Sequence, residues 1–171
     1  SVEQHLRPEL REKTVGIVPV QADGTCVIAA TADAKKLGVK VGMRVREARR
    51  LCPHLTLVQA RPSLYVDVHQ QLIRSIDECV PIHRVYSIDE WAIRLQGVER
   101  DPHAAIELAH RIKRQLLNDF SPWLSCSIGI APSRLLAKIA SDIDKPNGLV
   151  VLSPSDLPDR LDGLKLNDFA G

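Results

Sequence analysis

The stretch Tyr86–Leu95 reads YSIDEWAIRL and resembles a β-strand that is interrupted by two acids. Aromatic and β-branched residues alternate roughly with polar ones along it, as in a strand with one buried face. Asp89 and Glu90 nevertheless stand side by side in its middle. A hairpin turn, or an exposed strand edge blunted by charge, would explain the pair without any function. The alternative is a Mg²⁺ site, because adjacent carboxylates repel each other unless a cation lies between them.

Composition narrows the protein class. The chain has 171 residues, 44% of them apolar, and a net charge of +2. The sequence shows no apolar run of membrane-spanning length and no signal peptide, so we expect no membrane partner. Its four cysteines are scattered without CxxC pairs, which favours free thiols in a cytoplasmic protein over a zinc site. Six aromatic residues are too few for a platform on which single-stranded nucleic acid stacks.

One segment is strongly basic. Between residues 35 and 50, a single acid, Glu47, accompanies seven basic residues: Lys35, Lys36, Lys40, Arg44, Arg46, Arg49 and Arg50. Two interpretations stay open, a solvated helix face or a patch that contacts nucleic-acid phosphates without reading sequence.

Short elements are predicted for the first part of the chain. We expect strands over 15–20, 26–30 and 56–58 and helices over 32–37 and 45–51, with a turn at Asp23-Gly24. Longer elements follow: helices over 64–79, 102–119 and from Ser133, and strands over 83–88, 91–95, 124–130 and 148–152. Gly129 lies on a strand face of small residues that another backbone can approach closely. A polar helical tail is expected after residue 152.

This order predicts an α+β fold. Residues 61–130 give helix, strand, strand, helix, strand, which lacks only one leading strand of the βαββαβ unit. We therefore expect a ferredoxin-like antiparallel sheet with helices on one face, its first strand missing because it precedes Ser1. The small basic α/β region would be inserted after that strand.

Three ordered motifs carry a family resemblance. They are YSIDEWAIRL, SCSIGIAPSRLLAKIASDIDKPNGLVVL at 125–152, and ATADAKKLGVKVGMRVREARRLCP at 30–53. Together they resemble Y-family (DinB/UmuC-type) translesion DNA polymerases, with UmuC-like features in the fingers. The resemblance implies a fingers subdomain at 1–60, a palm at 61–152 and the start of a thumb at 153–171.

The resemblance also implies site residues. Asp89 and Glu90, with a third Asp from the first strand, would be the catalytic acids that hold two Mg²⁺ ions. Lys145 of KPNG matches a lysine that contacts the incoming triphosphate, although a helix C-terminus favours a lysine there in any case. Lys35 stands where many members carry a triphosphate-binding Arg. Three residues of the basic segment would then contact DNA: Arg46, Arg49 and Arg50.

The implied function is template-directed nucleotidyl transfer in DNA-damage bypass and repair, as part of the SOS response. Implied partners are primer-template DNA, deoxynucleoside triphosphates and a sliding clamp. Two rivals are a non-catalytic, ImuB-like DNA-binding adaptor that has lost acidic ligands, and a nucleotidyl cyclase, which shares the palm. The fingers and KPNG argue against the cyclase. Residues 1–171 alone are expected to fold, to bind DNA weakly at most and to incorporate no nucleotide.

Overall fold

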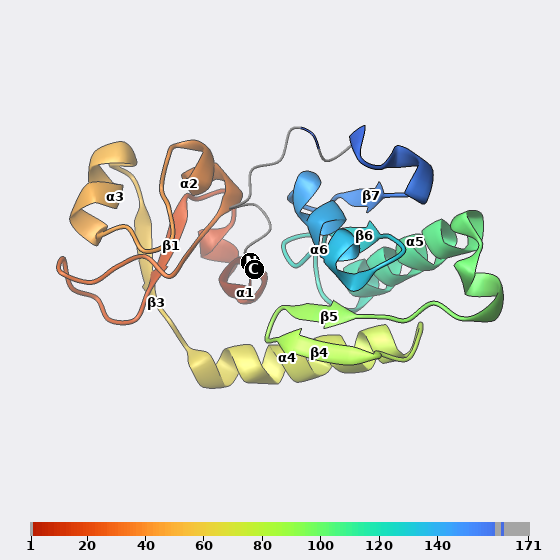
Figure 1. Ribbon diagram of the computed structural model, residues 1–171. Coiled ribbons are helices and arrows are strands. Elements are labelled where there is room, and N and C mark those ends of the chain that lie inside the picture. Colours follow the sequence, from red (N-terminus) through yellow and green to blue (C-terminus); the bar gives the residue numbers. More distant parts are fainter. Residues whose placement is uncertain (1, 160–161, 163–171) are drawn as a thin grey trace. The chain divides into compact units, whose positions relative to one another are not determined.

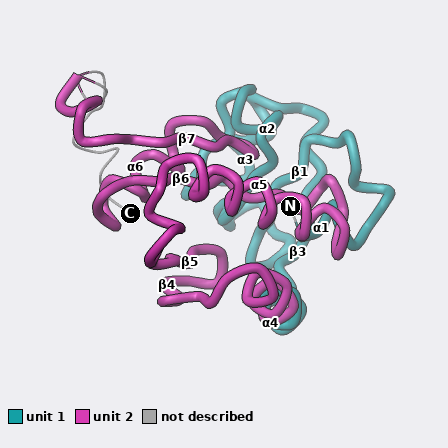
Figure 2. The backbone as a smooth tube through the Cα atoms, turned by 90° about the vertical axis from the view of Figure 1, so that its right-hand side faces the viewer, with its two compact units in different colours: residues 1–69 teal, residues 70–171 magenta. Residues whose placement is uncertain are grey.

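The chain folds into two compact units, residues 1–69 and 70–171 (Figure 2). A computed structural model describes residues 2–159 and 162 (Figure 1). The helix α4 (Pro62–Asp77) contributes residues to both units.

Unit 1 is built on a small three-stranded sheet. Strand β1 (Val15–Val18) lies between β2 (Ala29–Ala30), which is antiparallel to it, and β3 (Thr56–Gln59), which is parallel. All four residues of β1 are buried, as its continuous apolar sequence VGIV requires. The helices α2 (Ala32–Lys36) and α3 (Val45–Leu51) follow the predicted bounds closely. Gly38 takes a positive φ of 92° after α2, which a glycine tolerates.

The start of unit 1 was not predicted as structured. It forms α1 (Val2–Leu6) and the short 3-10 helix η1 (Pro8–Leu10). Glu3 of α1 is only 2% exposed and accepts hydrogen bonds from Arg61 (2.7 and 3.1 Å) and from the Tyr65 hydroxyl (2.8 Å). These contacts attach α1 to the first turn of α4.

Unit 2 contains the predicted palm elements. Its strands are β4 (Arg84–Ser87), β5 (Glu90–Ala92), β6 (Ile128–Ile130) and β7 (Leu149–Val151). Its helices beyond α4 are α5 (Pro102–Asp119) and α6 (Arg134–Ile143), and its 3-10 turns are η2 (Gly97–Arg100) and η3 (Pro154–Asp156). The helix ends follow local sequence, because Asp101 caps α5 and Ser133 caps α6 with side-chain hydrogen bonds.

The strands of unit 2 form a layer between helices. Figures 1 and 2 show α4 and α5 on one side of the strands and α6 on the other. Ser75 of α4 donates a hydrogen bond of 2.6 Å to Asp119 of α5, so these two helices pack side by side. Their buried residues within unit 2 supply the apolar layer: Leu72, Ile76, Ala105, Leu108, Ala109, Ile112 and Leu116.

The strands of unit 2 form two separate pairs within the described residues. Strands β4 and β5 are antiparallel, and β6 and β7 are parallel. The α+β class is confirmed. The parallel pairing of β7 arises because α6 forms the crossover between the two strands.

Some details differ from expectation. The strand predicted over 124–130 is ordered as a strand only at Ile128–Ile130. Of the predicted thumb entrance at 153–171, residues 160–161 and 163–171 lie outside the described residues.

Candidate active site

The acidic pair lies at the turn of the β4–β5 hairpin. Ser87 pairs with Glu90 across the hairpin, which leaves Ile88 and Asp89 at its tip. The Ser87 hydroxyl donates a 2.7 Å hydrogen bond to Asp89 Oδ1 and so fixes the orientation of that carboxylate. Asp89 is exposed, and no cationic side chain in the described parts of the chain lies within ion-pair distance of it. The acidic pair therefore does lie at a hairpin turn, as one of the two simple explanations predicted. The turn does not, however, compensate the charge of Asp89.

Glu90 is half-buried and has a cationic neighbour. Lys138 Nζ of α6 lies 3.3 Å from Glu90 Oε2 and 3.5 Å from Asp142 Oδ2. Burial disfavours the charged ammonium, but the Asp142 and Glu90 carboxylates outweigh it and raise the pKa of Lys138. Lys138 is thus a fixed positive charge that holds Glu90 against α6.

One face of α6 carries a row of charged residues. Arg134, Lys138 and Asp142 follow each other at intervals of four, which places them on the same side of a helix. Lys145 continues the row just beyond the helix and forms an ion pair with Asp142. Contacts therefore run without interruption from Glu90 through Lys138 and Asp142 to Lys145.

The KPNG loop is held by α5. Lys113 Nζ donates hydrogen bonds to Cys126 O (2.8 Å), Asn147 O (2.8 Å) and Asn147 Oδ1 (2.7 Å). Burial lowers the pKa of Lys113. Gly148 closes the loop where any side chain would collide with the backbone oxygen of Asp144. The position of Lys145 thus depends on a loop whose shape is set by packing.

Close packing also sets the distance of α6 from the sheet. A Cβ atom added at Gly129 of β6 would collide with the Ala137 carbonyl oxygen and lie 2.5 Å from the Ser141 nitrogen. The predicted small face of this strand is confirmed. It lets the α6 backbone come close enough for Lys138 to meet Glu90.

The other predicted site residues belong to unit 1. Lys35 is exposed on α2, and Arg46, Arg49 and Arg50 are exposed on α3. Arg49 is already paired with Asp23 at 2.8 Å. The roles of Lys35 and the three arginines stay predictions.

The hairpin offers some, but not all, of the ligands that a Mg²⁺ ion needs. Two neighbouring carboxylates offer the oxygen ligands that Mg²⁺ prefers, and the unpaired charge of Asp89 attracts a cation. Within residues 2–159 and 162, however, no group of three His, Cys, Asp or Glu side chains converges on one point. Complete coordination would need further oxygens, such as those of substrate phosphates.

Comparison with known proteins identifies the family. The model of the impB/mucB/samB family matches residues 1–142. The chain belongs to that family. The match confirms the predicted resemblance to Y-family translesion polymerases.

Curated relatives and solved structures agree with this assignment. DNA polymerase IV of Moorella thermoacetica is 34% identical over 174 residues, and that of Pelotomaculum thermopropionicum is 35% identical over 173 residues. Both alignments cover all of this chain but only 43% and 42% of the relative. The crystal structure of DinB from Sulfolobus solfataricus matches with a TM-score of 0.86 and 31% identity, over 99% of this chain and 50% of that one. An insertion ternary complex of Dbh DNA polymerase matches with a TM-score of 0.80 and 30% identity, over the same shares of the two chains.

Sequence reasoning missed Lys138 and Asp142, which link Glu90 to Lys145, and Lys113, which holds the KPNG loop. Lys138 and Asp142 could have been found from helical spacing, because they precede Lys145 by seven and three residues. Lys113 had no such signal, since its three acceptors are carbonyl and amide oxygens that no side-chain pattern reveals.

Proposed function

We propose that residues 1–171 form the fingers and palm of a translesion DNA polymerase. In this proposal unit 1 supplies the fingers and unit 2 the palm, and primer-template DNA and deoxynucleoside triphosphates are the substrates. The observation that carries it is the continuous set of contacts from Glu90 through Lys138 and Asp142 to Lys145. This set links a candidate metal ligand to a candidate triphosphate ligand on one short helix.

Each residue has a distinct task in this proposal. Asp89, oriented by Ser87, and Glu90, held by Lys138, would be ligands of Mg²⁺. The bound ions would stabilise the attacking and leaving oxygens of an in-line displacement. Lys145 would neutralise triphosphate oxygens, and Asp142 would hold its ammonium in position. Nucleotidyl transfer depends mainly on such positioning and charge.

A third carboxylate, implied by the resemblance, would come from a further strand of the palm sheet. The edges of β5 and β6 support this idea, because each strand has one partner among the described residues and could accept a second. A sliding clamp and a cytoplasmic location stay predictions.

Primer extension by a chimeric protein tests the proposal. Residues 1–171 would replace the matched segment of the Moorella DNA polymerase IV, so that the relative supplies every other part. We expect Mg²⁺-dependent extension of a primed template and no cyclic product from free triphosphates. A chimera that folds and binds DNA but extends no primer would favour the non-catalytic adaptor instead.

A further inference from the structure

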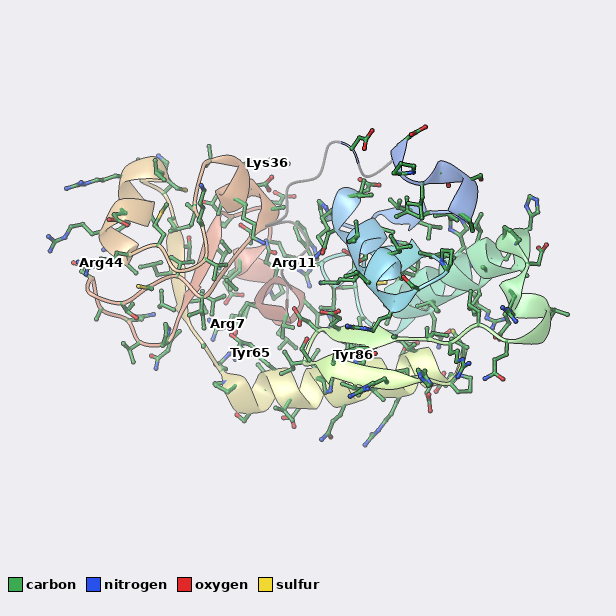
Figure 3. All side chains as sticks on the ribbon, viewed as in Figure 1. Arg7, Arg11, Lys36, Arg44, Tyr65 and Tyr86 are labelled. Carbon is green, nitrogen blue, oxygen red and sulfur yellow. The ribbon has the colours of Figure 1, made fainter. Side chains whose placement is uncertain are left out.

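Two arginines of unit 2 share one tyrosine ring beside the acidic hairpin. The guanidinium carbon of Arg84 lies 5.3 Å from the ring centroid of Tyr86, and that of Arg134 lies 4.7 Å from it. Arg84 and Tyr86 lie on β4, which Figure 3 marks by the label of Tyr86, and Arg134 is the first residue of α6. Cation–π attraction therefore holds two positive charges at one place.

The charge of this cluster is not compensated. In the described part of the chain, no carboxylate lies within ion-pair distance of either guanidinium. Two like charges held together repel each other. Arg134 also stands at the N-terminus of α6, where the helix dipole disfavours a cation. A bound anion would relieve both effects.

The cluster is accessible to a large ligand. Tyr86 is 37% exposed, and both arginines are exposed on the same unit. Arginine is well suited to phosphate, because its planar fork donates two parallel hydrogen bonds.

The order of the charged residues along α6 indicates which phosphate groups of the substrates the two arginines would bind. From the C-terminal end it reads Lys145, Asp142, Lys138 and Arg134, and Lys138 contacts Glu90 in the middle. In an in-line displacement the attacking and leaving oxygens lie on opposite sides of the reacting phosphorus. If the leaving diphosphate lies toward Lys145, the strand with the attacking hydroxyl approaches from the Arg134 end.

We propose that Arg84, Tyr86 and Arg134 form a clamp for backbone phosphates of the primer strand close to its 3′ end. This proposal rests on the proposed function. The tyrosine keeps both guanidiniums in place, and the arginines make the phosphate contacts.

The salt dependence of DNA binding tests the clamp. Residues 1–171 would be titrated with a fluorescent primer-template duplex at several salt concentrations. Each lost phosphate contact lowers the slope of log K against log salt by about 0.9, so Arg84→Ala with Arg134→Ala should lower it by about 1.8. The matched control is Arg100→Ala with Arg114→Ala, which removes the same charge from exposed positions of the same unit and should leave the slope unchanged.

Tyrosine variants separate positioning from charge. Tyr86→Phe keeps the ring and should bind like the unchanged chain, whereas Tyr86→Leu should weaken binding although the net charge is the same. The clamp would be overturned if the Arg84/Arg134 and Arg100/Arg114 double variants gave the same slope of log K against log salt. Undetectable DNA binding by the unchanged chain at low salt would also overturn it.

The chimera separates this proposal from the proposed function. There, Arg84→Ala with Arg134→Ala should raise the apparent KM for primer-template and leave the KM for nucleotide unchanged. A higher KM for nucleotide alone would place the arginines on the triphosphate and overturn the primer assignment. A chimera that extends primers normally despite the double variant would refute the clamp and leave the polymerase assignment intact.

Discussion

At the scale of single residues, some charged side chains of the candidate site form ion pairs and one does not. Glu90, Asp142 and Lys145 each have an oppositely charged partner, whereas Asp89 has none among the described residues. An unpaired carboxylate beside a paired one is expected where a cation and a substrate arrive together. In the proposed function, the paired residues would hold the site in its geometry before the cation and the substrate bind.

Lys145 provides the first prediction. In the chimera, Lys145→Ala should raise the KM for nucleotide and lower kcat/KM by roughly 10- to 100-fold, the scale of one charge-assisted hydrogen bond. Steady-state kinetics would measure this, with the exposed Lys13→Ala as the control. An unchanged KM would leave Lys145 with only its helix-terminal role.

At the scale of elements, close backbone contact decides where α6 lies. Gly129→Ala would push a methyl group into the Ala137 carbonyl, so α6 must shift. We expect a loss of about 1–3 kcal/mol in the free energy of unfolding of unit 2, measured by denaturant titration. Gly24→Ala is the control, because nothing lies within 4 Å of its added Cβ. Equal stability of the two variants would show that α6 is not held by this contact.

The Glu3 contacts give a pH prediction. Burial raises the pKa of Glu3, but hydrogen bonds from Arg61 and Tyr65 and the charges of Arg61 and Arg7 outweigh it, so the pKa lies below 4.5. The carboxylate therefore stabilises unit 1 at pH values above 4.5, and this stability is lost as pH falls through the lower folded pKa. Glu3→Gln should cost about 3 kcal/mol at pH 7 and progressively less in acid. Thermal unfolding from pH 7 to pH 3 measures it, with the exposed Glu47→Gln as control; a pH-independent difference would contradict the assignment.

The helices and strands differ in how well the sequence predicted them. Residue patterns placed α3 and α5 at their observed bounds, because Pro53 follows the end of α3 and α5 carries a clear apolar face. The strand at 124–130 was predicted too long, since strand pairing with β7 covers only Ile128–Ile130. The acids were found because two carboxylates are conspicuous in an apolar stretch. Their partner Lys138 was not, because a lysine on a helix is ordinary until the fold brings it to Glu90.

At the scale of the whole molecule, DNA binding is expected to draw on basic groups in both units. Neutral variants of the arginines in unit 1 test their contribution to DNA binding. Removing Arg46 and Arg50 should each lower the salt slope of DNA binding by about 0.9, and removing Arg49 should lower it less because Asp23 already pairs with it. The same titration used for the clamp measures this. An unchanged slope would show that these arginines lie on an ordinary solvated helix face and do not contact DNA.

Single-turnover nucleotide incorporation by the chimera tests whether Asp89 and Glu90 form the catalytic centre. Asp89→Asn removes charge from an exposed turn and should leave folding intact. It should nevertheless slow incorporation by more than about 100-fold, because even outer-shell partners of a metal are worth 10- to 100-fold. Glu90→Gln should act in the same direction. A folded Asp89→Asn chimera that incorporates nucleotide at the rate of the unchanged chimera would contradict the account.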